Sequence, residues 1–568
     1  MRNRFSIFFF LVLFTNEAIS QYRIIPSHSD DEDRLISLNR DINTAFRNTN
    51  ASSDYIRSLR EIESDNSPPG FSKVNFPYFY WQYPEYSKNN RLNITQSKFV
   101  KKIGENHFWT NPNRFFSWES KSREDYFVIN PILDLAYSPK IGKIDTFLSN
   151  GRGVEIYGQM GEKLSFYTSV MDYQMSYPSF IDDYIVQNGV VPGVGNTQAN
   201  KSKLTEFYYS TGYMNILLLQ KKIKAIEKHH LDTTVYKIDF SIGHDKQFIG
   251  NGFRSLLLSN FAPPSFYAQI NYKLGPFSYQ NLFKQLVRDM SRDTNKMLNR
   301  KYLAMHRGEI AFFKNKFNLG FSEMIVFSRP NNAFDITYLN PIIFYRSIER
   351  DLGSSDNALI GLDFSYKLKT LKFYGQLIID EFRFSAITTD RNSYLNKNGY
   401  QLGLYWFPKF KSIKQNYIQL EFNSVRPYTY SHWSSNYYSH YNQPLAHPLE
   451  SNFRELVLRS FWIPKINTRF SIKNTLIIAN RGINSNNENV GSDFRLNYYT
   501  ASNRKDANML SGKLRNIVSS SITFRYFLLP NCTIEFTHNL RIENDDIQNY
   551  AMIGLKFNFN QSRDIFQF

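Results

Sequence analysis

Short segments in which apolar and polar residues alternate run through most of this chain. In Tyr417–Asn423 the even positions are apolar, and the odd positions are polar or amphipathic. Successive side chains of a β-strand point to opposite faces, so this segment predicts a strand between water and an apolar environment. Comparable alternation, with polar spacers between the segments as in an antiparallel meander, occurs at residues 164–169, 237–242, 267–273, 362–367, 401–406 and 552–559.

These strands predict a transmembrane barrel rather than a soluble sheet. After residue 20 no apolar run is long enough for a membrane helix, and 17% of the residues are aromatic. A mean hydropathy of −0.45 is compatible with a barrel, since only alternate residues face lipid. At about 25–30 residues for a strand and its connection, residues 71–568 hold about 16–20 strands. A soluble sandwich or propeller would show a fixed repeat, and none is found.

The N-terminus has the features of a secretory signal peptide over residues 1–20. Arg2 and Arg4 precede the apolar core Phe5–Phe14, and Ala18-Ile19-Ser20 forms a small-x-small cleavage site. The alternative is an uncleaved anchor, but the core is too short for a bilayer of about 30 Å. Cleavage would make Gln21 the first mature residue.

Residues 21–70 differ from the predicted barrel. Residues 33–48 and 52–63 have apolar residues at helical spacing, with Asp33 and Ser52 as candidate N-caps. The sequence Ser67-Pro68-Pro69-Gly70, which disfavours regular secondary structure, ends the region. We expect a small helical module, periplasmic if residues 71–568 form the barrel; the alternative is a flexible leader.

Charge and cysteine content narrow the classes of partner. The formal charge of +18 favours polyanions. At a bacterial surface these are acidic polysaccharides and lipopolysaccharide, whereas a secreted chain rarely meets nucleic acid. The single Cys532 excludes an internal disulfide framework and a cysteine-rich zinc site.

Residues 243–262 combine glycines with polar side chains at a predicted strand end. No helix-forming segment or Walker lysine follows in register, so a nucleotide loop is not expected. Glycine permits tight turns and close backbone approach, which favours a kink facing the lumen. Asn251 and Arg254 are candidates for hydrogen bonds to a sugar or a carboxylate.

Asn340-Pro341 interrupts the strand pattern, because proline is poorly tolerated inside a sheet. We expect a loop or an inward fold here. Tyr345 and Arg346 are ligand candidates, and the alternative is a plug contact within the lumen.

A dense aromatic block covers residues 425–448. Aromatic faces stack on sugars while Tyr and Trp keep a polar handle; the alternative is an interfacial aromatic girdle. The saccharide candidates in this block are Arg426, Tyr428, Tyr430, His432, Trp433, His440 and Tyr441. The spacings of His432, His440 and His447 fit no standard metal pattern, so neither a metal nor a cofactor is expected.

No catalytic pattern stands out. The chain has no G-x-S-x-G elbow and no H-E-x-x-H motif. Asp380 and Glu381 are adjacent and would point to opposite faces of a strand. We therefore expect a non-enzymatic protein, although a triad assembled in space would be invisible in the sequence.

Four blocks of sequence occur in order. They cover residues 243–262, residues 338–346 continuing through 353–359, residues 374–382, and residues 425–432 with 440–448. Together they resemble the Wzi-like capsule-assembly family, and most closely its RemB-type gliding-motility branch, over roughly residues 150–460. The resemblance implies an outer-membrane barrel of about eighteen strands with a periplasmic helical element. It also implies a role in holding surface polysaccharide, or in adhesion and gliding.

The sequence thus predicts an all-β protein, an antiparallel transmembrane β-barrel of about 18 strands with a small N-terminal helical module. We expect it to bind or organise capsular or other surface polysaccharide at the cell outer membrane. The expected partners are acidic polysaccharide or lipopolysaccharide, outer-membrane lipid, and motility or export proteins. The alternatives are an uptake channel and an enzyme acting on lipid or glycan.

Overall fold

The computed structural model describes most of the predicted barrel. The described residues are 46–48, 116–119 and 125–558, without 140–146, 162, 196–197, 200–203, 228–229, 293–295, 314, 343, 381–391, 468, 486 and 530–531. The predicted signal peptide lies outside them, and so does most of the helical module predicted for residues 21–70. Within that module the structure describes only residues 46–48, where the predicted helix is wrong, because these residues form a strand that pairs with residues 247–249.

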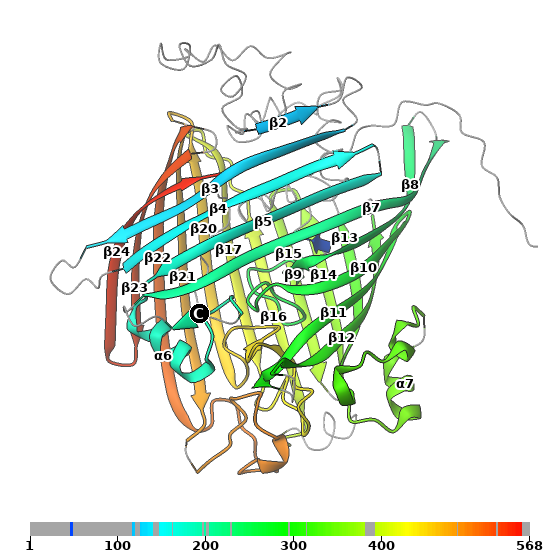
Figure 1. Ribbon diagram of the computed structural model, residues 1–568, viewed down its shortest axis with the longest axis vertical. Helices are drawn as coiled ribbons and strands as arrows, with labels where there is room; N and C mark the ends of the chain where they lie inside the picture. Colours follow the sequence, from blue (N-terminus) through cyan, green and yellow to red (C-terminus); the bar gives the residue numbers. More distant parts are fainter. Residues whose placement is uncertain are drawn as a thin grey trace, which may run out of the picture.

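Within the described part of the chain, eighteen strands pair antiparallel with their neighbours, and the last pairs with the first to close a barrel (Figure 1). This confirms the predicted barrel, and each alternating segment lies in one of its strands, as far as the structure describes the segment. The strands are β3 (Tyr126–Ser138), β4 (Phe147–Met160), β5 (Leu164–Met175), β7 (Thr205–Glu227), β8 (His230–Asp245), β10 (Ser265–Leu274), β11 (Phe277–Arg292), β12 (Leu298–Phe312), β13 (Phe317–Phe327), β14 (Asn357–Leu368), β15 (Leu371–Asp380), β16 (Lys397–Trp406), β17 (Ile413–Val425), β20 (Phe453–Pro464), β21 (Phe470–Ile483), β22 (Lys513–Leu529), β23 (Cys532–Glu543) and β24 (Asp546–Phe557).

The remaining elements are short. The small strands are β1 (Phe46–Asn48), β2 (Phe116–Glu119), β6 (Gln198–Ala199), β9 (Gln247–Ile249), β18 (Ser439–His440) and β19 (Gln443–Pro444). The helices are α6 (Ser179–Asn188), α7 (Tyr345–Leu352) and the 3-10 turns Pro330–Asn332, Ile336–Leu339 and Tyr498–Thr500. None of the described helices is long and apolar enough to cross a membrane.

The two ends of the barrel differ in the length of their connections. At one end, the turn end, short turns such as residues 275–276 and 369–370 join the strands, and β3 begins and β24 ends there. The other end, the loop end, lies at the bottom of Figure 1 and carries all the long connections. These are residues 176–204, 246–264, 328–356, 381–396, 426–452 and 484–512. Short turns on one side and long loops on the other are typical of bacterial transmembrane barrels.

The alternation along the strands separates an apolar outside from a polar inside. On β16 and β17, Leu402 and Leu420 are exposed on the outer wall, whereas Gln401 and Glu421 are buried in the lumen. Such a wall suits hydrocarbon outside and polar filling inside.

Two connections from the loop end fold into the lumen. Residues 246–264 join β8 to β10, and residues 426–452 join β17 to β20. Almost all of their side chains are buried. Their apolar side chains pack with inward side chains of β13 to β15 in the largest described core cluster. We call these two segments together the plug.

Candidate functional site

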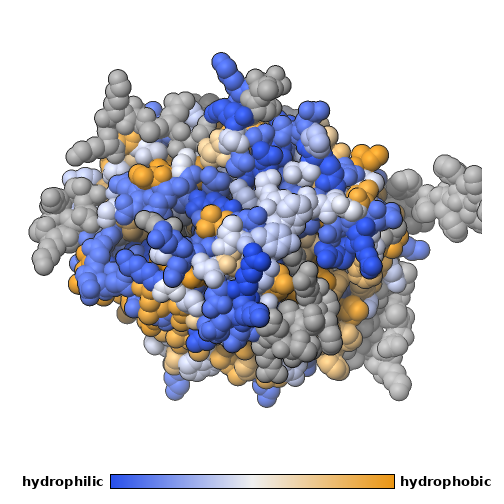
Figure 2. Space-filling view, turned by 90° about the horizontal axis from the view of Figure 1, so that it is seen from below, coloured by the Kyte–Doolittle hydropathy of each residue, from blue (hydrophilic) through white to orange (hydrophobic). Residues whose placement is uncertain are grey.

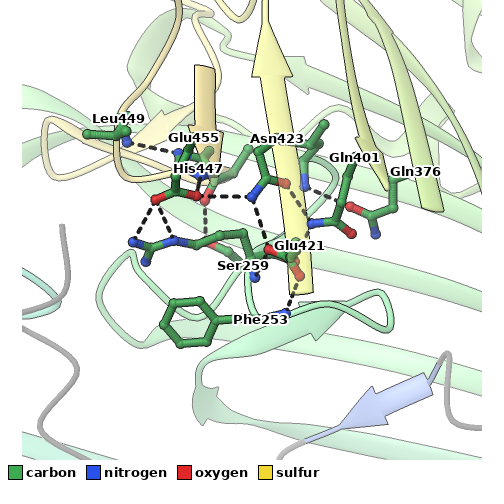
Figure 3. A network of polar contacts seen from close by, with 12 residues as sticks. Phe253, Ser259, Gln376, Gln401, Glu421, Asn423, His447, Leu449 and Glu455 are labelled. Carbon is green, nitrogen blue, oxygen red and sulfur yellow. Dashed lines mark hydrogen bonds and ion pairs between the residues drawn. The ribbon is translucent and has the colours of Figure 1, made fainter. Parts of the chain in front are cut away.

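Polar side chains of the barrel wall bind the backbone of the first plug segment. Glu421 of β17 accepts hydrogen bonds from the backbone N–H groups of Phe253 (2.6 Å) and Arg254 (3.0 Å) (Figure 3). Gln401 of β16 donates to the carbonyl of Arg254 (2.9 Å). Gln376 of β15 accepts from the N–H of Leu256 (2.8 Å). These wall side chains satisfy the buried backbone of a segment that has no strand partner at these positions.

Glu455 of β20 is the centre of the polar network. Its carboxylate accepts hydrogen bonds from Arg254 Nη2 (3.1 Å), His447 Nε2 (2.8 Å) and Asn423 Nδ2 (3.0 Å) (Figure 3). The side chains of Glu455 and His447 are fully buried. Arg254 belongs to the first plug segment and His447 to the second, so one wall carboxylate holds both.

The two plug segments also bind each other directly. The hydroxyl of Tyr430 donates to the carbonyl of Leu256 (2.8 Å). The hydroxyl of Tyr438 donates to the carbonyl of Leu257 (2.8 Å). Neighbouring carbonyls of one segment therefore bind tyrosines of the other.

The plug reaches the opposite wall as well. Lys301 Nζ of β12 donates to the carbonyl of Tyr437 (2.7 Å) and to Ser439 Oγ (3.1 Å). His440 Nδ1 accepts from the N–H of Val287 of β11 (2.9 Å). The plug is thus bound to β11 and β12 on one side and to β15, β16, β17 and β20 on the other.

Most of the predicted saccharide residues belong to this plug. Asn251, Arg254, Tyr428, Tyr430, His432 and His440 are buried. Asn251 accepts from Lys372 Nζ (2.8 Å), and Tyr441, half-buried, follows His440 in the same segment. Their burial does not fit an interfacial girdle. In the structure they are plug residues, and their contact with saccharide stays a prediction.

Aromatic side chains of the block at residues 425–448 and of the connection between β21 and β22 reach the surface of the loop end. The side chains of Trp433 and Tyr499 are 45% and 48% exposed. The rings of His432 and Trp433 are 5.5 Å apart, and those of Tyr498 and Tyr499 are 4.7 Å apart. A third contact joins the two pairs, since His432 and Tyr498 lie edge to face at 6.2 Å.

Cations accompany these rings. Arg504 lies 5.8 Å from the ring centre of Tyr394, and Lys397 Nζ lies 4.4 Å from that of Tyr498. Figure 2 views the loop end and shows a mostly hydrophilic face, with hydrophobic side chains gathered mainly toward its edge. We call the following set the loop-end aromatic cluster: Tyr394, Tyr428, His432, Trp433, Tyr498, Tyr499 and Arg504.

Arg426 holds this cluster together. It donates to the carbonyls of Asn396 (2.9 Å) and Ala507 (3.2 Å), which belong to two other loops. The sequence reasoning missed Tyr394, Tyr498, Tyr499 and Arg504. A signal for the last three was present, because Tyr498-Tyr499 and Arg504-Lys505 stand in a polar connection.

The structure places Tyr345 and Arg346 at the start of α7, on the connection from β13 to β14. Tyr345 is buried, its ring 4.0 Å from that of His306, while Arg346 is exposed. The connection is a loop, as expected, but it packs on the outer wall and makes no plug contact through these two residues. In the described part of the chain, no three His, Cys, Asp or Glu side chains form a group that could hold a metal ion.

We expect acid to loosen the plug through His440. Burial, which has the largest effect, and the charges of Lys284, Lys301 and His244 together lower the pKa of His440 from 6.5 to about 3, and the hydrogen bond with the carbonyl of Pro264 opposes this shift in part. In an opened plug the pKa would return toward 6.5, so protonation favours opening as the pH falls from 6.5 toward 3. At about pH 5 the closed plug should lose roughly 2 kcal/mol of stability relative to the opened plug.

Conductance in a planar bilayer, measured from neutral pH down to about pH 5, checks this. The current should rise as the pH falls, and His440→Gln, which cannot titrate, should flatten the rise. His447, whose pKa is also lowered by burial, accounts for a residual slope. An unchanged pH profile in His440→Gln would contradict the expectation.

Comparison with known proteins identifies the family of this chain. A family model described as capsule assembly protein Wzi matches residues 149–470. No curated protein matches the chain. The solved Wzi structure, described as an outer membrane protein of group 1 capsule assembly in Escherichia coli and a carbohydrate-binding β-barrel, is 12% identical with a TM-score of 0.46, covering 76% of this chain and 84% of that one.

Porins are also among the similar solved structures. A BenF-like porin of Pseudomonas fluorescens Pf-5 is 8% identical, with a TM-score of 0.38 and coverage of 76% of this chain and 98% of that one. OccK2 of Pseudomonas aeruginosa in complex with glucuronate is 7% identical, with a TM-score of 0.39 and coverage of 77% and 96%. The family match extends over more than half of the chain, so the protein belongs to the Wzi capsule-assembly family and is a barrel of the outer membrane.

Proposed function

We propose that this protein is a non-enzymatic barrel that binds acidic surface polysaccharide at its loop end and retains it during capsule or exopolysaccharide assembly. Loops of outer-membrane barrels face the outside of the cell, where such polysaccharide lies. Retained polysaccharide would support adhesion and gliding, the role of the RemB-type branch that the sequence resembles.

One observation carries the proposal: the loop-end aromatic cluster stands on a plug that is bonded to both sides of the lumen. Exposed rings offer stacking faces for sugars. Arg504 adds a planar cation of the kind that pairs with carboxylates. Because the plug is held by buried hydrogen bonds, the cluster is a fixed surface and loses little conformational entropy on binding.

The plug also favours this function over an uptake channel. An open pore of this strand number would have an aqueous lumen. Here wall residues of β11, β12, β15, β16, β17 and β20 all bind lumenal segments. We therefore expect little conductance from the resting protein.

Removing the exposed rings should weaken saccharide binding without unfolding the barrel. We expect Trp433→Ala with Tyr499→Ala to reduce affinity for acidic polysaccharide by roughly tenfold or more, since each aromatic contact contributes about 0.5–1.5 kcal/mol. Arg504→Gln should reduce affinity for acidic but not for neutral polysaccharide. Binding of refolded protein to an array of acidic and neutral glycans measures both effects.

Tyr208→Ala is the matched control. Tyr208 is an exposed tyrosine on β7, near the loop end but outside the loop-end aromatic cluster. The Tyr208→Ala substitution should leave glycan binding unchanged. Equal binding by the control and the cluster variants would refute the proposed site, and turnover of labelled glycan or lipid by the wild type would favour an enzyme.

A further inference from the structure

The connection between β13 and β14, residues 328–356, lies on the outer wall. The sulfur of Met324 of β13 lies 3.3 Å from the plug hydroxyl of Tyr438, so Met324 points inward. By alternation Glu323 and Ile325 point outward, and the connection packs on that side. Figure 1 shows α7 beside the strands near the loop end. We call residues 328–356 the outer hook.

Two tyrosines fix the outer hook to the wall. Tyr338 and Tyr345 are fully buried in a cluster with outward side chains of β12, β13 and β14. The ring of Tyr338 lies 4.6 Å from that of Phe327. The wall members of the cluster are Tyr302, Ala304, Ile325, Phe327 and Ala358.

The hook also covers polar groups on the outer wall. Glu323 accepts hydrogen bonds from the backbone N–H groups of Tyr345 (2.9 Å) and Arg346 (3.0 Å), the first two of α7. Asn281 Nδ2 donates to the carbonyl of Pro341 (3.4 Å). A carboxylate facing hydrocarbon is unfavourable, whereas a helix N-terminus stabilises one. The outward polar side chains of the wall are therefore paired with backbone groups of the outer hook.

The tip of the hook descends below the rim of the wall. The ring of Phe344 lies 6.4 Å from that of Phe321, which stands six positions before the loop-end terminus of β13. At about 3.4 Å per residue, and with the tilt of barrel strands, this depth is roughly 15 Å. At that level the wall exposes apolar side chains such as Leu319 and Ile310.

The tip itself is apolar, and the helix above it carries two arginines beside two acids, Glu349 and Asp351. Ile342 is 82% exposed and Phe344 61%. Ile336 and Leu339 of the same connection are also exposed. Arg346 and Arg350 are exposed on α7, and Arg346 keeps half of its side chain in solvent although it pairs with Glu349. Apolar insertion below cations is the pattern of interfacial membrane elements.

We propose that the outer hook is a docking site for anionic glycolipid of the outer leaflet: its tip contacts acyl chains, and Arg346 and Arg350 bind headgroup phosphates. Two observations select this occupant over a second copy of the chain. The tip continues the exposed apolar band of the wall, a surface that faces hydrocarbon in a transmembrane barrel. The cations stand above that band, where phosphates lie. The site does not depend on saccharide binding by the plug.

Site-specific labels test the contact with acyl chains. In a Cys532→Ser background, Ile342→Cys carries a fluorophore in nanodiscs that hold one barrel each and contain lipids with brominated acyl chains. Val186→Cys on α6, also highly exposed (84%), is the control. We expect acyl bromine to quench the label at 342 and aqueous iodide to quench the label at 186. Iodide quenching of both labels, or no bromine quenching of the label at 342 in these single-barrel discs, would overturn the proposal.

Charge variants test the headgroup contact. Arg346→Gln with Arg350→Gln should lower the lipopolysaccharide retained by purified protein, measured by native mass spectrometry, by roughly tenfold. Lys369→Gln with Lys409→Gln removes the same charge at the turn end, where both lysines are exposed, and should change retention little. Equal losses in the two variants would show a general charge effect and refute the site.

Discussion

Glu455→Ala should loosen the plug and convert a nearly silent barrel into a conducting one. The substitution leaves Arg254 and His447 without their shared carboxylate in a buried site. Removing one partner of a buried ion pair typically costs about 3–5 kcal/mol. That loss falls on the contacts that tie both plug segments to β20, so the plug should leave the wall before the barrel unfolds.

Conductance in planar bilayers and thermal unfolding measure the two effects separately. Glu535→Ala is the matched control, because Glu535 is also buried in the wall and binds Lys556 and Arg525, but no plug residue. It should lower stability by a comparable amount and leave the conductance low. Similar currents from both variants would mean that the conductance reports a damaged wall and not a released plug.

The wall of the barrel was predictable because membrane and lumen impose a local rule. Each strand needs apolar side chains on one face and polar ones on the other, so residues 417–423 of β17 already show their role. The two ends follow from connection length. These features require no knowledge of which distant residues meet.

The plug was not predictable in this way. Arg254 and Glu455 are far apart in sequence, and only the closed barrel brings them together. The aromatic block at residues 425–448 correctly suggested a special segment. Its alternation, however, says nothing about whether the tyrosine hydroxyls bind sugars or the carbonyls of Leu256 and Leu257.

The sequence contained a signal for the outer hook, but predictions from single segments did not use it. Asn281, His306 and Glu323 stand at outward positions of β11, β12 and β13, where a lipid-facing wall should be apolar. Polar residues at such positions predict that something covers them. The Asn340-Pro341 break showed that a loop follows β13, but the direction of the loop depends on these outward residues.

Asp356→Ala should release the outer hook from the wall. The carboxylate of Asp356 is fully buried and accepts from both terminal nitrogens of Arg329 (2.8 Å each), from the hydroxyl of Tyr338 (2.6 Å) and from Ser354 (2.7 Å). Arg329 lies just before the first 3-10 turn of the outer hook, and Asp356 lies just before β14. The pair therefore joins the two ends of the hook. Losing the acceptor leaves the hydroxyl of Tyr338 and the terminal nitrogens of Arg329 without their shared carboxylate, while Arg329 Nε keeps its pair with Asp335. Because Arg329 is partly exposed, we expect a cost of about 1–3 kcal/mol. Because these contacts join the two ends of the outer hook, residues 329–356 should become more sensitive to protease.

Limited proteolysis followed by mass mapping of the cut sites checks this prediction. Asp493→Ala is the matched control, since Asp493 forms a comparable bidentate pair with Arg495 in another loop at the same end and does not contact the hook. Its cuts should fall within residues 484–512. If residues 329–356 stay protected in Asp356→Ala, the contacts of Tyr338, Tyr345 and Glu323 with the wall are enough to hold the outer hook. The ion pair between Arg329 and Asp356 would then add little to its stability.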